Sequence, residues 1–211
     1  RNPYYWKDGA DGKKLPYVDE ARFIVIPDDA TRIIKLQTGE LDGIEFVPFS
    51  RVADLKSDPK IDMRLIPAAK VIYLAMNNRP DLKDGSKNPL GDKRVRQAMN
   101  YAVDKEAIAK AIYFGKGRSL PSLFNPAVVD YDKDSAKIMP KHDPKAAAKL
   151  LEDAGWKMGA DGIREKDGEK ASFTVYGIRN SDNPRISEAM QADLRKVGID
   201  MKIQLWDATV A

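Results

Sequence analysis

Hydrophobic and polar positions in the first fifty residues alternate between a strand pattern and a helix pattern. Residues 23–26 form a run rich in β-branched side chains that Pro27 ends. A helical face then runs to a C-terminal stop at Gly39, and residues 41–47 return to a strand pattern. That face consists of Ala30, Ile33, Ile34 and Gln37. The order predicts a strand–helix–strand unit, the kind that builds a parallel sheet.

The next segments predict one short helix and two strands. Residues 50–57 place Val52 and Leu55 on one side of a short helix. Residues 63–66 and 71–76 then predict two strands. The second is almost entirely apolar, so we expect it to be buried on both faces of a sheet.

Four longer helices and two further strands are predicted in the rest of the chain. Each helix follows an Asp or an Asn-Pro start and carries an apolar stripe. The stripes are Val95, Ala98, Met99 and Ala102; Ala107, Ile108, Ala111 and Ile112; Ala147, Leu150, Leu151 and Ala154; and Ile186, Ala189, Met190 and Leu194. Residues 173–176 predict a strand, and residues 199–206 alternate apolar and polar side chains. The fold class predicted is therefore α/β.

Composition narrows the class of protein. The chain is 43% hydrophobic and 32% charged, which is the balance of an ordinary globular protein. No apolar run reaches the length of a membrane helix, and the first six residues have no signal-peptide pattern, so no membrane span is expected. The net charge of +4 is spread among acidic residues, which argues against a nucleic-acid partner.

Candidate catalytic and metal-binding groups are few. Cysteine is absent, and His142 is the only histidine. It precedes Asp143-Pro144, where an exposed residue before a helix cap is the simpler interpretation. Residues 115–117, Gly-Lys-Gly, lack the spacing of a phosphate-binding loop and end a helix instead of opening one. We therefore predict no catalytic site, no metal site and no cofactor.

Six segments, in order along nearly the whole chain, resemble family 5 of the extracellular solute-binding proteins of bacterial ABC transporters. This family includes dipeptide-, oligopeptide- and nickel-binding proteins. The segments are 1–6 (RNPYYW), 26–42 (IPDDATR through LQTGELD), 73–78 (YLAMNN), 94–105 (RVRQAMNYAVDK), 143–156 (DPKAA through LLEDAGW) and 191–199 (QADL through VGI). Six collinear segments make a chance match improbable.

The resemblance implies a part of the type II periplasmic-binding-protein fold, with residues 1–67 in one lobe and residues 68–211 forming the first part of the other. It implies a receptor, not an enzyme, that closes around a di- or oligopeptide and delivers it to ABC transporter permease subunits. The location implied is periplasmic or lipid-anchored. Another solute on the same scaffold, such as a nickel chelate, a sugar or an opine, stays open, and an anionic-surface or nucleic-acid binding module is a weaker alternative.

The candidate ligand-binding residues follow predicted strands. Tyr73 lies within the apolar segment, and Asn77, Asn78 and Arg79 come directly after it, where open α/β sheets tend to bind ligands. Amide and guanidinium groups suit a peptide backbone and a carboxylate, although the same residues could simply form a turn. Trp206, on the closing strand, could stack on a ligand or cover the sheet. Unpaired sheet edges would also favour a dimer.

Overall fold

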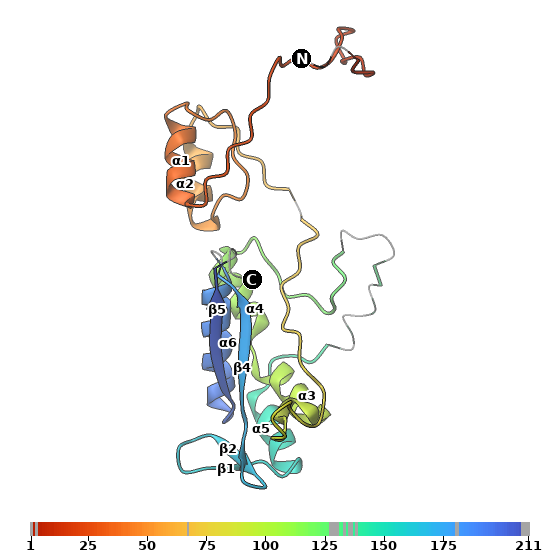
Figure 1. Cartoon of the computed structure of the whole chain (residues 1–211), viewed down its shortest axis with the longest axis vertical. Helices are drawn as coiled ribbons and strands as arrows, with labels where there is room; N and C mark the ends of the chain where they lie inside the picture. The colour runs from red at the N-terminus through yellow and green to blue at the C-terminus, as the bar shows by residue number, and fades with distance from the viewer. Residues whose placement is uncertain are drawn as a thin grey trace. The chain divides into compact units, whose positions relative to one another are not determined.

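The computed structural model describes residues 2, 4–66, 68–126, 131–132, 134, 137, 139–179 and 182–207 of the chain (Figure 1). Pro67, at the predicted boundary between the lobes, lies outside the described residues, as do parts of the predicted irregular stretch 118–140. The chain divides into two compact units, Arg1–Val47 and Pro48–Ala211. The boundary between these units falls earlier in the chain than the predicted boundary between lobes.

The first unit contains one helix, α1 (Asp29–Gln37), among its described residues. The carboxylate of Asp28 caps it by accepting hydrogen bonds from the Thr31 backbone N–H (2.8 Å) and hydroxyl (2.5 Å). Gly39 follows the helix with φ 79°, a backbone conformation that favours glycine. The predicted helix, its cap and its stop are confirmed.

Helices dominate the second unit. They are η1 (Phe49–Arg51), α2 (Val52–Ser57), η2 (Pro89–Gly91), α3 (Lys93–Ala102), α4 (Lys105–Tyr113), α5 (Pro144–Asp153) and α6 (Asn183–Lys196). Aspartates at the starts of α3, α4 and α5 accept hydrogen bonds from backbone N–H groups of the first turn, as the sequence predicts. None of the helices in the described part of the chain is long and apolar enough to cross a lipid bilayer.

Two small sheets complete the second unit. β1 (Lys157–Met158), β2 (Arg164–Lys166) and β3 (Glu169–Lys170) form an antiparallel sheet in that order. β4 (Ser172–Ile178) and β5 (Asp200–Trp206) run parallel, in a register from Ser172 opposite Asp200 to Ile178 opposite Trp206. The chain between them forms α6, which lies along the pair (Figure 1). This β4–α6–β5 segment is a strand–helix–strand unit.

One hydrophobic core joins α3, α5 and α6 to one face of the β4–β5 pair. Its fully buried side chains come from α3, α5, α6, β5 and the residue just before β5, and include Val95, Leu151, Leu194, Ile199 and Met201. Phe173, Val175 and Ile203 add the core-facing positions of the two strands. The predicted alternation of residues 199–206 is confirmed, because Met201 is buried while Lys202 and Gln204 are exposed.

A buried arginine ties the small antiparallel sheet to this core. Arg164 is 3% exposed, and its guanidinium donates hydrogen bonds to the carbonyl oxygens of Val197 (2.9 Å) and Trp156 (2.8 Å) and to Glu152 Oε1 (3.2 Å). Gly198 passes directly over it with φ 85°, and a Cβ there would lie 2.8 Å from Arg164 Cγ. Glycine is therefore required at position 198 for both reasons.

Four predicted strands are wrong. Residues 23–26, 41–47, 63–66 and 71–76 form no strand, although all of them are described. A strand requires a neighbouring backbone to pair with its N–H and C=O groups, and among the described residues none of these segments belongs to a sheet. Segment 71–76 is not buried on both faces either, since Tyr73 is 64% and Ile72 39% exposed, while Leu74 and Met76 pack against the core.

The predicted buried faces of the helices are confirmed only in part. All four stripe residues of α3 are buried, but in α4 the buried residues are Ala109 and Ile112, and Ala107 and Ala111 are exposed. In α1 only Ile33 is buried, and Ile34 is 57% exposed. An alanine-rich helix has nearly equivalent faces, so local periodicity does not determine its rotation.

Candidate functional site

A buried asparagine, Asn88, holds the segment that carries Asn77, Asn78 and Arg79 through hydrogen bonds to its backbone. Asn88 is 7% exposed, and its amide nitrogen donates to the carbonyl oxygens of Asn77 (2.9 Å) and Arg79 (2.8 Å). Its Oδ1 accepts from the Leu90 backbone N–H at 3.1 Å, so the same side chain caps η2. Asn88 therefore fixes the backbone on which the predicted ligand-binding residues stand.

Within this segment the side chains have different environments. Asn77 Oδ1 accepts a hydrogen bond from the Arg79 backbone N–H at 3.1 Å, which is a local turn contact. The residues Tyr73, Asn78 and Arg79 are exposed. All four residues lie on the surface, and the turn interpretation describes the side chain of Asn77.

Trp206 belongs to a different group of residues. Its ring stacks on that of Tyr176, with the centroids 5.2 Å apart and the planes 9° from parallel. The two rings are 40% and 60% exposed, on the face of the β4–β5 pair opposite the core. Sequence reasoning missed Tyr176. Its even position in the alternating strand 172–178, in phase with Trp206 once the parallel register is known, is the signal that identifies it.

The Tyr176–Trp206 stack lies toward the carboxyl ends of both parallel strands. There the Arg179 backbone N–H donates to the Trp206 carbonyl (2.7 Å), and the Asn183 amide donates to the Ile178 carbonyl (2.7 Å) at the start of α6. The first bond joins the ends of the two strands, and the second joins the end of β4 to the start of α6. An aromatic surface on a rigid backbone at the carboxyl edge of parallel strands suits an apolar or planar ligand group.

Tyr113, at the end of α4, lies close to the same helix start. Its hydroxyl is buried, and its ring meets Phe49 edge to face with centroids 5.3 Å apart. Burial, together with the nearby negative charge of Asp182, raises the pKa of Tyr113 to about 12. A Cβ on Gly117 would lie 2.5 Å from the tyrosine ring, so Gly117 permits this burial.

The raised pKa of Tyr113 predicts a loss of stability in alkali. Because the neutral phenol is favoured in the folded state, its stabilisation is complete below pH 10 and is lost as the pH rises to about 12. We expect Tyr113→Phe to flatten the thermal stability profile over this range. The melting temperatures of the parent and of Tyr113→Phe are measured at several alkaline pH values. If both fall equally steeply with pH, the raised pKa of Tyr113 does not contribute to stability.

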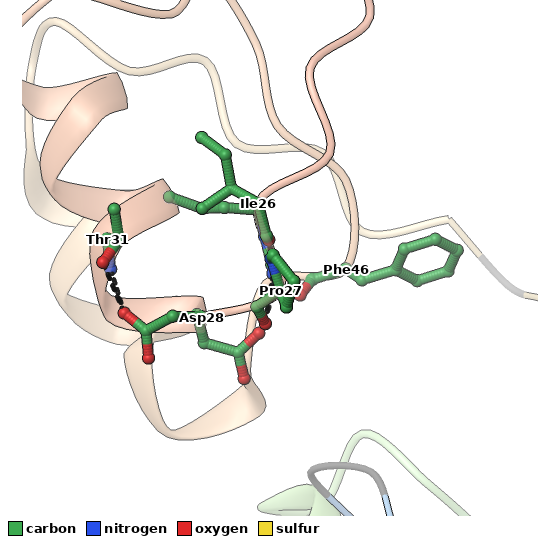
Figure 2. Close-up of polar contacts among 7 residues, drawn as sticks. Ile26, Pro27, Asp28, Thr31 and Phe46 are labelled. Atoms are coloured by element: carbon green, nitrogen blue, oxygen red, sulfur yellow. Dashed lines mark hydrogen bonds and ion pairs between the residues drawn. The ribbon is translucent and has the colours of Figure 1, made fainter. Parts of the chain in front are cut away.

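In the first unit, Arg32 contacts both segments that flank α1, and Figure 2 shows Ile26, Pro27 and Phe46, whose carbonyl groups it binds. Its Nη1 donates to the carbonyl oxygens of Ile26 (2.7 Å) and Pro27 (3.1 Å), and its Nη2 pairs with Asp29 and donates to the Phe46 carbonyl (3.4 Å). Phe46 has φ 56°, and its side chain is 83% exposed. This left-handed conformation costs a bulky residue about 1–2 kcal/mol.

Comparison with known proteins identifies the family. Residues 1–210 match the bacterial extracellular solute-binding proteins, family 5 (middle). The chain belongs to this family. The resemblance inferred from six sequence segments is thereby confirmed, and it covers both units.

Proteins similar to this family 5 chain are named for binding different solutes. It is 34% identical to a dipeptide-binding protein of Escherichia coli over 95% of its own length and 34% of the relative's. It is 33% identical to heme-binding protein A of Haemophilus influenzae, covering 92% of this chain and 32% of that protein. The chain thus spans about a third of the length of these curated relatives.

Solved structures of the family show the same fold. The oligopeptide-binding protein AppA from Bacillus subtilis, in complex with a nonapeptide, is 30% identical, with a TM-score of 0.74 over 88% of this chain and 36% of AppA. NikA from Brucella suis, in complex with Fe(III)-EDTA, is also 30% identical, with a TM-score of 0.69 over the same shares. The α/β fold of the family 5 chain is therefore part of a type II periplasmic-binding-protein fold, as predicted.

The predicted site residues of the family 5 chain form two groups. Asn77 and Arg79 share the amide of Asn88, with Tyr73 and Asn78 on the same segment, whereas Trp206 pairs with Tyr176. Across the described residues, no group of three or more His, Asp or Glu side chains is arranged to hold a metal ion.

Proposed function

We propose that this chain is part of a non-catalytic receptor that captures a di- or oligopeptide and delivers it to the permease subunits of an ABC importer. The observation that carries the proposal is the exposed Tyr176–Trp206 stack at the carboxyl ends of a parallel strand pair. Ligands of open α/β sheets bind at that edge. Membership in a family with peptide-binding relatives supports the same solute class.

In this proposal the two residue groups have different roles. Trp206 and Tyr176 contact apolar parts of the solute, because flat aromatic surfaces gain most from such contacts. Asn78 and Arg79 supply hydrogen bonds to its polar backbone and carboxylate, with Tyr73 beside them. Asn77 contributes through its backbone, since its side chain is engaged in the turn.

The location and assembly of the protein follow from the same proposal. A receptor for an importer works outside the cytoplasmic membrane, in the periplasm or held by a lipid anchor. Residues 1 to about 67 belong to one lobe and the rest to the other. Within the described residues β4 and β5 pair only with each other, so their outer edges favour pairing with a second copy of this chain. Analytical ultracentrifugation of the 211-residue chain would detect that dimer.

Binding experiments distinguish a peptide receptor from a receptor for another solute. The longest natural reading frame that contains this sequence is titrated calorimetrically with di-, tri- and nonapeptides, and in parallel with a nickel–histidine chelate and with heme. These controls follow from relatives named for nickel and heme binding. Binding of peptides alone supports the proposal. If the protein binds the nickel chelate or heme but no peptide, the solute assigned to the receptor changes accordingly. If it binds none of these solutes, the receptor function is contradicted.

Substitution of Trp206 tests the proposed aromatic contact. We expect Trp206→Ala to lower peptide affinity about fivefold, because a stacked aromatic contact contributes on the order of 1 kcal/mol. Trp6→Ala is the matched control, because Trp6 is also exposed and stacks on Tyr5 with centroids 5.5 Å apart. Calorimetric titration measures both variants. Equal losses in the two variants, or none in Trp206→Ala, would count against the contact.

A further inference from the structure

Phe46 combines a left-handed backbone with an exposed side chain, as Phe114 also does at the C-terminal end of α4 (φ 50°, 56% exposed). The backbone of Phe46 lies in the left-handed region at φ 56°, which bulky side chains seldom adopt, and its side chain is 83% exposed. The ring is therefore not placed there by burial within its own unit. Backbone conformations of this kind persist where the surroundings fix them, and they concentrate at ligand-binding positions.

The surroundings that fix Phe46 are the hydrogen bonds of Arg32. One guanidinium group holds the Phe46 carbonyl together with those of Ile26 and Pro27, while Asp29 fixes the guanidinium itself. The Arg32 side chain is only 18% exposed, so these bonds are partly shielded from water. Figure 2 shows the Phe46 ring pointing away from α1 and from the carbonyls that Arg32 holds.

The position of Phe46 in the chain also bears on its role. Ile26 and Pro27 end the segment that enters α1, and Phe46 lies near the end of the segment that follows it, so Arg32 holds the ends of these two segments together. A ring without polar atoms, held rigidly there, suits an aliphatic or aromatic group.

We propose that Phe46 is a solute-contacting residue that receives an apolar side chain of a bound peptide, and that Arg32 is the positioning residue that presents it. The inference rests on the proposed peptide receptor function and adds a preference among peptides. Phe46 thereby determines specificity for peptides with a large apolar residue at one position.

The test compares tripeptides that differ only in the place of one phenylalanine. Phe-Ala-Ala, Ala-Phe-Ala, Ala-Ala-Phe and Ala-Ala-Ala are titrated calorimetrically into the longest natural reading frame that contains this sequence. We expect at least one phenylalanine peptide to bind more tightly than Ala-Ala-Ala, and Phe46→Ala to reduce that ratio about tenfold. Phe46→Leu, which keeps an apolar side chain, should retain much of the preference.

Phe46→Gly separates a solute contact from a packing role. Glycine relieves the left-handed backbone, so the unliganded variant should melt at the same temperature or higher, while the peptide preference is lost. If the ring instead packs against another part of the protein, both Phe46→Ala and Phe46→Gly lower the melting temperature and weaken every peptide equally. That result would overturn the inference.

Arg32→Lys keeps the charge but removes the planar fork. We expect it to reduce the same affinity ratio, a readout that a general loss of stability would leave unchanged. If the parent binds tripeptides and Phe46→Ala keeps the parent ratio, the assignment of Phe46 is wrong and the receptor function stands. If the parent binds no peptide at all, the peptide function fails and this inference with it.

Discussion

Replacement of Arg164 by methionine should lower the melting temperature of the 211-residue chain by roughly 10 °C, which corresponds to about 3 kcal/mol for a protein of this size. Methionine fills much of the same space but donates no hydrogen bond. The carbonyl oxygens of Val197 and Trp156, which accept from the guanidinium at 2.9 and 2.8 Å, then remain buried without that donor. Leaving buried acceptors unsatisfied costs more than the net value of the bonds themselves.

Arg195→Met is the matched control for this prediction. Arg195 is exposed and donates one hydrogen bond, from Nη2 to the Asp161 carbonyl at 3.0 Å. Its loss should change stability by no more than about 0.5 kcal/mol, as for most surface substitutions. Thermal and urea unfolding of both variants measure the difference. A loss in Arg164→Met no larger than that in Arg195→Met would show that Arg164 does not hold the antiparallel sheet to the core.

The positions of the helices could be predicted because their determinants are local. Asp28, Asp92, Asp104 and Asp143 each cap the helix that begins at the next residue, and Gly39 ends one. A cap requires only neighbours in the chain, so it is visible in the sequence. The rotation of α4 was not predictable in the same way, because its buried face depends on packing against η1 and α6.

Strands depend on partners that are distant in the chain. Residues 172–178 and 200–206 form strands because each pairs with the other across α6. Segments 23–26 and 71–76 have strand composition too, but neither pairs with another segment in the part of the chain that the structure describes. An apolar run of this kind therefore indicates a tendency to form a strand, and whether the strand forms depends on a pairing partner.

The candidate site was predictable only for residues with conspicuous side chains. Trp206 and the Asn77–Arg79 segment stand out by type and by position after an apolar run. Asn88 and Arg32 do not, since each acts through backbone carbonyls brought near by folding. Tyr176 likewise requires the register of β4 against β5 before it joins Trp206. Residues that act through contacts formed only on folding cannot be recognised from their neighbours in the sequence.

Asn88→Ala should destabilise the protein by about 3 kcal/mol and weaken peptide binding about tenfold. The substitution removes both donors to the carbonyls of Asn77 and Arg79 and the acceptor that caps η2 at the Leu90 N–H. Segment 77–79 then loses its support, and ordering it again on binding costs part of the affinity. Hydrogen exchange over residues 77–91, thermal unfolding and calorimetric titration measure the three effects.

Asn88→Asp separates the two roles of this side chain. Aspartate keeps an oxygen that can cap η2 but has no amide donors, and it places negative charge beside the carbonyls of Asn77 and Arg79. If those donors hold the segment, Asn88→Asp should be at least as destabilised as Asn88→Ala and bind peptide as weakly. If Asn88→Asp instead matches the parent in stability and affinity, the cap of η2 is its main role, and the segment is held by the Asn88 backbone N–H, which donates to the Pro80 carbonyl at 2.9 Å.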